Sequence, residues 1–306
     1  MPVILSGIKT LTIGSRGSQL ALWQARHVAS RLNQLGGATR IEIIKTTGDH
    51  LQTASLVEAG GKGLFTKEIE EALLAGTIDL AVHSLKDLPT EMPVGLAIAA
   101  IPEREDARDA MVGLRLAELP ERARVGTSSG RRAAQLRMLR PDLEVQPIRG
   151  NVDTRIRKLK EGKYDAIVLA AAGLLRLGLE EEIAEILAPE HVCPAPGQGA
   201  LAIQTRAGDA AQLTCAELNH QATQQAVTCE RAALAALGGG CQLPIGAFAR
   251  VVQDAIELMA VVISPDGRYQ LKAQASGPRA HPEDLGRMVA QDLLRRGADR
   301  ILAEST

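Results

Sequence analysis

Three stretches of this sequence share one arrangement: an apolar run ends in a small polar turn, and a helical pattern follows at once. The turns lie at 15–18, 126–132 and 149–154, and each carries glycine, a hydroxyl side chain and arginine. Strands that lead directly into helices are the building units of α/β folds, in which helices cover a mostly parallel sheet. The chain is therefore expected to adopt an α/β fold, with these turns at the carboxyl ends of strands.

Apolar runs and helical periodicity extend this pattern along the whole chain. Strands are expected at 11–14, 41–46, 78–82, 95–101, 143–148, 165–172, 201–205, 247–252, 255–263 and 269–275. Helices are expected at 19–35, 65–75, 180–187, 221–237 and 282–296. A charged stretch at 102–106 and a proline- and glycine-rich stretch at 192–200 are typical of crossings between domains. We expect three domains, formed by 1–104 with 197–219, by 105–196 and by 220–306.

Composition excludes several classes of protein. The formal net charge is −1, and aromatic residues make up only 2% of the chain, so a nucleic-acid partner is not expected. No window has the roughly 18 uncharged apolar residues of a membrane span, and the first residues lack a secretion signal, which predicts a cytoplasmic protein. The four cysteines show no metal-binding or disulfide spacing, so no metal site is expected.

The three arginine-bearing turns predict a site for a small polyanion. Free backbone N–H groups and the helix dipole converge at a helix N-terminus and attract anions. Between Arg122 and Lys163 the chain carries twelve Lys or Arg against four Asp or Glu. For any single turn, an ordinary capped helix start with a solvated arginine is the alternative interpretation.

A run of polar and ionisable residues, His83 to Thr90, follows the expected strand 78–82. Ligands bind at the carboxyl ends of strands in α/β sheets, so this run is expected to line a binding cleft. Lys86 beside Asp87 is its most informative pair. The alternative is a surface turn with a solvated ion pair, and His83 by itself is more typical of a buried, hydrogen-bonded histidine.

Glycines surround one cysteine in the last third of the chain, from Gly238 to Gly246. Their conformational freedom would let the loop present the thiol of Cys241 outward. The alternative is a glycine helix cap with a buried cysteine. Two other glycine-rich stretches fail their nucleotide-binding patterns, because Gly63 stands where a phosphate loop needs Ser or Thr, and 201–205 is a strand pattern where a dinucleotide fingerprint needs a helix.

Taken together, five motifs resemble the porphobilinogen deaminase family, also called hydroxymethylbilane synthases. They occur in the family's order and span nearly the whole chain. The motifs are His83-Ser-Leu-Lys-Asp-Leu-Pro89, Gly126-Thr-Ser-Ser-Gly-Arg-Arg132, Arg149-Gly-Asn-Val-Asp-Thr-Arg155, Ala195-Pro-Gly-Gln-Gly199 and Gly240-Cys241. The resemblance implies two doubly wound domains of the type II periplasmic-binding-protein kind, with the active site in the cleft between them, and a smaller C-terminal α+β domain.

The resemblance also implies an activity, that of a transferase of tetrapyrrole (haem) biosynthesis. In this family the cysteine that matches Cys241 holds a dipyrromethane cofactor through a thioether, and the enzyme assembles that cofactor from its own substrate. Four porphobilinogen molecules are then added one by one, each losing ammonia. The linear tetrapyrrole hydroxymethylbilane is released by hydrolysis, and the enzyme is expected to act as a monomer.

Residue roles follow from the resemblance together with the chemistry of the substrate. Porphobilinogen carries acetate and propionate groups, so the growing chain is a polyanion that suits guanidinium forks. Asp87 is expected to be the catalytic group, because a carboxylate can stabilise the positive charge that develops when ammonia leaves. The residues expected to bind cofactor or substrate carboxylates are Arg16, Ser18, Lys86, Thr127, Ser128, Ser129, Arg131, Arg132, Arg149, Arg155 and Arg176.

Other functions remain open from the residues alone. A non-catalytic anion-binding protein on the same two-lobed scaffold would explain the arginines without a role for Cys241. A cysteine hydrolase would need a histidine that activates Cys241, and His83 and His191 are the candidates in predicted site loops.

Overall fold

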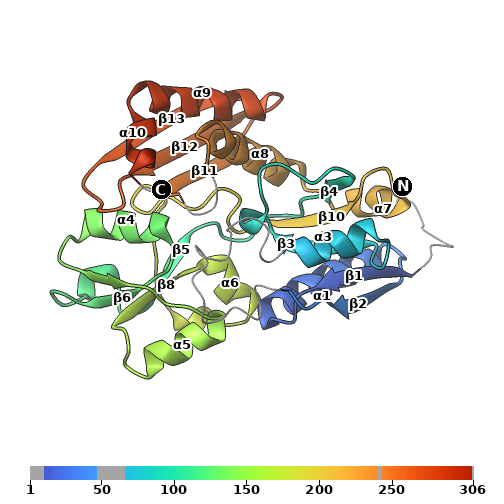
Figure 1. The fold of residues 1–306 in the computed structure, drawn as a ribbon, viewed down its shortest axis with the longest axis horizontal. Coiled ribbons are helices and arrows are strands. Elements are labelled where there is room, and N and C mark those ends of the chain that lie inside the picture. Colours follow the sequence, from blue (N-terminus) through green and yellow to red (C-terminus); the bar gives the residue numbers. More distant parts are fainter. Residues whose placement is uncertain (1–9, 47–65, 240–242, 305–306) are drawn as a thin grey trace. The chain divides into compact units, whose positions relative to one another are not determined.

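The computed structural model describes residues 10–46, 66–239 and 243–304 (Figure 1). The chain divides into two compact units, Met1–Arg104 with Ala200–Gln224 and Glu105–Gly199 with Gln225–Thr306. Each unit therefore combines two stretches of chain that are far apart in sequence. The division into three domains that we expect from the sequence remains a prediction, separate from this division into two units.

The first unit is built on a five-stranded sheet in the order β2-β1-β3-β10-β4 (Figure 1). β1 pairs in parallel with β2 and β3, whereas β10 runs antiparallel to β3 and to β4. The strands are β1 Leu11–Ser15, β2 Thr39–Ile43, β3 Leu80–Ser84, β4 Leu96–Ala100 and β10 Leu201–Arg206. The helices are α1 Gln19–Gln34, α3 Lys67–Leu74 and α7 Ala210–Ala216, and a 3₁₀ turn, η1, spans Leu85–Asp87.

Helices cover both faces of this first sheet, because successive side chains of a strand point to opposite faces. In β3, Leu80 and Val82 belong to the apolar cluster formed with α1, whereas Ala81 belongs to the cluster formed with α3. From the helices, Leu32 of α1 and Leu73 of α3 are both fully buried. The sheet is thus doubly wound.

The second unit contains a sheet of the same design, in the order β7-β6-β8-β5-β9. Three parallel strands lie side by side, and an antiparallel strand, here β5, occupies the fourth position as β10 does in the first sheet. The strands are β5 Asp109–Gly113, β6 Arg124–Gly126, β7 Glu144–Gln146, β8 Ala166–Ala170 and β9 Ile183–Ile186. The helices are α4 Gly130–Leu139, α5 Val152–Lys160 and α6 Ala171–Arg176, with 3₁₀ turns η2 Leu116–Glu118 and η3 Glu180–Glu182.

Both faces of the second sheet are again covered. In β8, Ala166 and Val168 pack in the cluster that contains Leu136 of α4, whereas Ile167 and Leu169 pack in the cluster that contains Ile156 of α5. This alternation repeats the arrangement of the first sheet.

The expected helix at 180–187 is wrong. Only Glu180–Glu182 form a short 3₁₀ turn, and β9 follows as a strand that pairs antiparallel with β5, with Ala110 opposite Ile186. Three consecutive glutamates favour a helix locally, but β5 offers an open edge to a segment with isoleucine at 183 and 186, and that pairing outweighs the local preference. The strand expected at 165–172 likewise ends at Ala170, where α6 begins.

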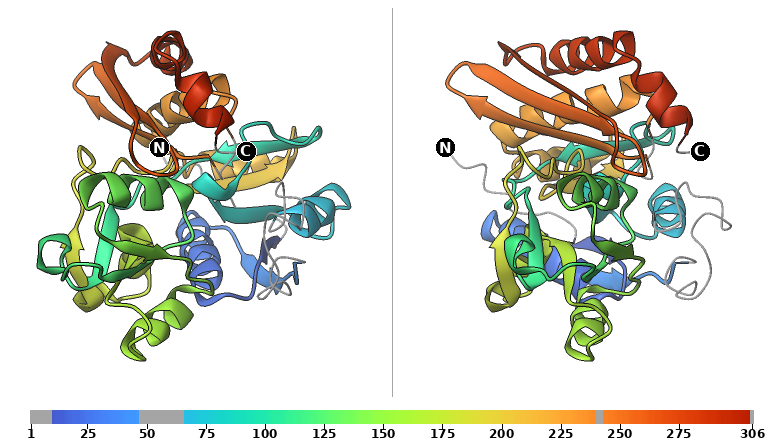
Figure 2. Two further views of the ribbon diagram at one scale, coloured as in Figure 1. Left: turned by 60° about the vertical axis from the view of Figure 1, so that its left-hand side comes forward. Right: turned by 90° about the vertical axis from the view of Figure 1, so that its left-hand side faces the viewer.

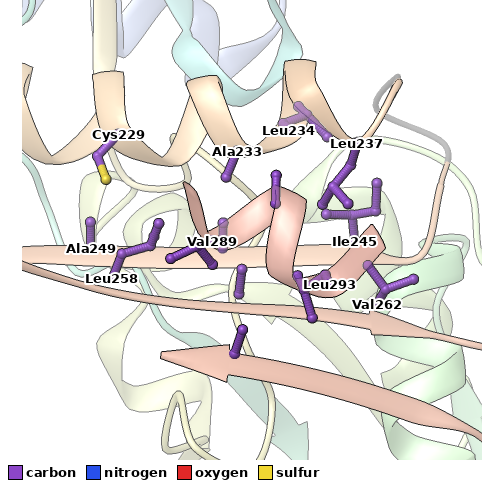
Figure 3. Close-up of a cluster of buried hydrophobic side chains, with 14 of the residues drawn as sticks. Cys229, Ala233, Leu234, Leu237, Ile245, Ala249, Leu258, Val262, Val289 and Leu293 are labelled. Carbon is purple, nitrogen blue, oxygen red and sulfur yellow. The ribbon is translucent and has the colours of Figure 1, made fainter. Parts of the chain in front are cut away.

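A three-stranded antiparallel sheet, β11-β12-β13, completes the second unit (Figure 2). Its strands are β11 Ile245–Val252, β12 Ala255–Ile263 and β13 Gln270–Pro278, and its helices are α8 Gln221–Ala236, α9 Pro282–Arg295 and α10 Ala298–Ala303. The helices pack on one face, where side chains of α8 and α9 meet those of β11 and β12 (Figure 3). On the other face, Met259 and Val261 pack against Cys193. Two doubly wound α/β sheets and a smaller α+β part confirm the fold class expected from the sequence.

Candidate active site

The polar run after β3 lies at the carboxyl edge of the first sheet. β1 and β3 are parallel neighbours, so the turns that follow them, 15–18 and 84–87, leave the sheet at the same edge. Leu85 and Leu88 are buried, and the N–H of Leu85 donates to the carbonyl of Ala200 at 3.0 Å. Between these anchors Lys86 is half-buried and Asp87 is exposed. The leucines therefore fix a turn that presents the two charged side chains outward.

The turn after β1 supplies the other two expected residues of this edge. Ser18 caps α1, and its Oγ accepts a hydrogen bond from the N–H of Ala21 at 3.3 Å. Arg16 is half-buried, and its charge contributes to lowering the pKa of His83. Arg16, Ser18, Lys86 and Asp87 thus lie at one edge of one sheet.

His83 is a buried residue held by hydrogen bonds. Its Nε2 lies 3.0 Å from Oε1 of Gln204, and Nε2 of Gln204 donates to Oε1 of Glu70 at 3.2 Å. Burial first, and then the charge of Arg16, lower the pKa of His83 to about 4, against the opposing effect of the Gln204 hydrogen bond. The imidazole is therefore neutral at pH 7, and it donates from Nε2, because the Gln204 oxygen faces it.

The carboxyl edge of the second sheet carries the hydroxyl-rich turn. The Oγ1 of buried Thr127 accepts a hydrogen bond from the N–H of Ser129 at 3.2 Å, and Ser129 caps α4. Ser128 is exposed, and its Oγ both donates to the carbonyl of Ile148 at 2.7 Å and accepts from its N–H at 3.1 Å. Ser128 thereby joins the turn after β6 to the turn after β7.

Arg131 and Arg132 stand in the first turn of α4 and are 4% and 6% exposed. Both pair with Asp109, which is 0% exposed: Nη1 of Arg131 reaches Oδ2 at 2.8 Å, and Nη2 of Arg132 reaches Oδ1 at 2.7 Å. Burial opposes ionisation of Asp109, but the two guanidinium charges outweigh it and hold its pKa well below the usual range. The result is a buried cluster of two cations and one anion.

The remaining expected arginines belong to neighbouring segments of the second unit. Nε of Arg155 donates to the carbonyl of Gly150 at 2.7 Å, and Arg149 lies at the other side of the same turn. Arg176 ends α6, is buried, and donates from Nη2 to the carbonyl of Gly199 at 2.6 Å. Burial lowers the pKa of Arg176 to about 10, with Glu105 acting in the opposite direction.

Cys241 lies outside the described residues. The two segments that flank its loop are described: Glu230 of α8 accepts from the N–H of Gly197 and from that of Ala249 in β11, both at 2.7 Å. The cysteines that the structure does describe are all buried, and burial raises the pKa of their thiols to about 12. They are Cys193, Cys215 and Cys229. At neutral pH these thiols are protonated and inert.

Four buried polar residues of these edges were not singled out by sequence reasoning. Asp109 and Gln198 contact the arginines of α4, Gln204 holds His83, and Glu230 joins three segments. Gln198 lies within a recognised motif but had no role there. No local sequence pattern indicates these four residues, because each forms its side-chain hydrogen bonds with residues at least 19 positions away in the chain. The shortest separation is the one between Glu230 and Ala249.

Across the described ranges, no group of three or more His, Cys, Asp or Glu side chains could hold a metal ion. A search of the same residues finds no helix of the length and apolar character that a membrane span requires.

Comparisons with known proteins identify the family. The family model described as "Porphobilinogen deaminase, dipyromethane cofactor binding domain" matches residues 11–214, and the C-terminal domain model of porphobilinogen deaminase matches residues 224–295. The porphobilinogen deaminase of Chromobacterium violaceum is 51% identical over 300 residues, covering 96% of this chain and 97% of that protein. That of Geotalea uraniireducens is 49% identical over 302 residues, covering 97% and 95%.

Among solved structures, a periplasmic substrate-binding protein of an ABC transporter from Coxiella burnetii gives a TM-score of 0.43 at 12% identity, over 68% of this chain and 91% of that one. The family assignment does not depend on that weak likeness. Two family models that together span nearly the whole chain, and full-length relatives near half identity, agree with each other. The chain belongs to the porphobilinogen deaminase family.

Proposed function

We propose that this chain is a hydroxymethylbilane synthase that joins four porphobilinogen molecules head to tail on a covalently held dipyrromethane and releases the linear product by hydrolysis. The observation that carries the proposal is the cationic carboxyl edge of the second sheet, found in a chain of this family. There, β6 and β7 run in parallel, so the arginines at the N-terminus of α4 and in the turn after β7 belong to the same edge of the sheet. Such an edge suits a ligand with many carboxylates.

The residues of this edge fit a dipyrromethane. Each of its pyrrole rings carries an acetate and a propionate, and planar guanidinium groups match carboxylates with paired hydrogen bonds. When bound, the cofactor supplies the pyrrole carbon to which the first substrate is joined. Carboxylates of cofactor and substrate would be held by Arg16, Ser18, Lys86, Thr127, Ser128, Ser129, Arg131, Arg149, Arg155 and Arg176, while Arg132 would add its charge from a position fixed by Asp109.

Cys241 is proposed as the attachment point. The cysteines of the described part of the chain are buried with raised thiol pKa values, which makes them poor nucleophiles. A cysteine flanked by glycines has the conformational freedom to reach a ligand. A thioether at Cys241 would keep the intermediates bound through successive additions.

Asp87 is proposed as the catalytic group. Its carboxylate is exposed at the end of a turn that buried leucines hold in place. It would stabilise the positive charge on the substrate when ammonia leaves, and it could move a proton at the same position. Neighbouring Lys86 would bind a carboxylate and keep the substrate oriented toward Asp87.

The intact mass of the denatured protein tests the proposal directly. We expect the wild-type chain to exceed its sequence mass by two linked pyrrole units, and the Cys241→Ser variant to show the sequence mass alone. A bare wild-type mass that persists after incubation with porphobilinogen would overturn the proposal and favour a non-catalytic anion-binding protein.

Partners and location complete the proposal. The chain would act on porphobilinogen as a monomer in the cytoplasm, without nucleic acid or membrane. Sedimentation of the loaded enzyme at working concentrations checks the oligomeric state, and a concentration-dependent mass would contradict the monomer.

A further inference from the structure

Asp109 is the most completely enclosed charge among the described residues of the second unit's carboxyl edge. It is the first residue of β5 and lies opposite Ala170, the last residue of β8. Because β5 runs antiparallel to β8, this places Asp109 at the edge where the parallel strands end. Oδ1 accepts from Nε and Nη2 of Arg132 and from Nε2 of Gln198, at 2.7 to 2.9 Å, and Oδ2 accepts from Nη1 of Arg131.

The two arginines use their nitrogens differently. Arg132 donates from Nε and Nη2 to Asp109, from Nη1 to the carbonyl of Val168, and from Nη2 also to the side chain of Gln198. Arg131 donates from Nη1 alone, to Asp109 and to the carbonyl of Cys193, the latter at 2.6 Å. Within the part of the chain that the structure describes, Nε and Nη2 of Arg131 make no hydrogen bond. These two nitrogens form one side of the guanidinium fork, the side that binds a carboxylate with paired hydrogen bonds.

The charges of the cluster do not cancel. Within the hydrogen-bonded cluster itself, two guanidinium groups face one carboxylate beside the N-terminus of α4, where the helix dipole is also positive, and the buried carboxylate of Glu230 accepts from the N–H groups of Gly197 and Ala249. A buried charge requires a partner. A carboxylate from a ligand at Arg131 would supply it.

We propose that Asp109 is the positioning residue of the anion site: it locks Arg132 into the fold and turns Arg131 so that the open side of its guanidinium group receives a ligand carboxylate. Asp109 itself does not touch the ligand. The inference rests on the proposed function for the identity of that ligand, a pyrrole carboxylate.

A double-mutant cycle in the full-length Cys241→Ser chain, which cannot carry the cofactor, tests this role by calorimetric titration with porphobilinogen. Asp109→Asn is expected to raise Kd at least tenfold, and Arg131→Met to do the same. Since Asp109 acts through Arg131, adding Asp109→Asn to Arg131→Met is expected to change Kd less than twofold further. Additive effects, or an unchanged Kd for Asp109→Asn, would overturn the proposal.

Asp142→Asn is the matched control, because Asp142 pairs with Arg140 at the other end of α4 and its side chain is 28% exposed, against 0% for Asp109. It is expected to leave Kd within twofold of the parent. If Asp109→Asn fails to fold, Asp109→Glu replaces it: the charge stays but moves by one methylene, so Kd is still expected to rise at least tenfold, and an unchanged value overturns the role. A parent that binds no porphobilinogen, together with a bare wild-type mass, would instead overturn the proposed function.

Discussion

In the turn after β3, different residues serve packing and chemistry: Leu85 and Leu88 anchor the turn, and Asp87 is the proposed catalytic group. Both leucines are buried, whereas Asp87 between them is exposed. Replacement of Asp87 therefore removes a charge without opening a cavity. This separation makes the proposed catalytic role of Asp87 testable apart from its structural surroundings.

We expect Asp87→Ala to retain the melting temperature of the wild type and to lose turnover by about 10²-fold or more, the usual effect of deleting a group that stabilises transition-state charge. Single-turnover release of ammonia measures the chemical step. Glu91→Ala, another exposed carboxylate on the same connection, is the control and should keep full activity. Turnover of Asp87→Ala within a few-fold of wild type would exclude Asp87 from the mechanism.

His83 makes the stability of the protein depend on pH. Its pKa is lowered from the ordinary value of 6.5 to about 4, chiefly by burial. Between these values the unfolded chain binds a proton that the folded chain does not, so stability falls as the pH drops from 6.5 to 4. The loss approaches about 3 kcal/mol at the low end. Urea unfolding at several pH values should show a flatter profile for His83→Gln, and parallel profiles would contradict this account.

At the scale of elements, the strand-to-helix turns were predictable because their signals are local. Ser18 and Ser129 cap the helices that follow them, and the apolar runs before them are strands. The strand β9 was not predictable, because its pairing with β5 depends on an edge supplied some 70 residues earlier in the chain. β5, α7 and α10 were missed for want of a strong local pattern.

The candidate site divides in the same way. The motifs indicated the residues that we propose to bind a ligand, but not Asp109, Gln198 or Glu230, which are buried and act on distant segments. From the sequence alone, a carboxylate such as that of Asp109 cannot be assigned to a buried cluster, because its partners are distant in the chain. Sequence therefore indicates the chemistry of this edge, and tertiary contacts reveal what holds it in place.

Glu230 gives a prediction about α8. Its two oxygens accept one N–H each, from Gly197 and Ala249, and in Glu230→Gln one oxygen is replaced by an amide NH₂ that cannot accept. One buried N–H is left without its acceptor, which should cost about 1–3 kcal/mol of unfolding free energy. Urea unfolding measures this, with exposed Glu283→Gln on α9 as the control. Equal stabilities for the two variants would show that the Glu230 contacts are dispensable.

For the whole molecule, charge is distributed unevenly along a chain that is nearly neutral. Residues 122–163 carry twelve basic and four acidic side chains, an excess of eight positive charges, while the complete chain has a net charge of −1. Attraction of a carboxylate-rich substrate is therefore local and open to screening by salt, since the Debye length is about 10 Å at 0.1 M.

We expect the KM for porphobilinogen to rise several-fold as potassium chloride is increased from about 50 to 500 mM, with a smaller change in kcat, because screening acts on exposed charges during binding. Sucrose at matched osmolality is the control and should leave KM unchanged. A salt effect confined to kcat would argue that charge attraction does not govern substrate capture.

The placement of β10 between β3 and β4 has a consequence for the order in which the protein matures on the ribosome. β3 and β4 are synthesised within the first 100 residues, but β10 begins only at Leu201. The strands of the second sheet, from 109 to 186, all emerge before it. The second sheet can therefore pair completely before β10 is available, so the first sheet, although it contains the earliest strands, is completed after the second one.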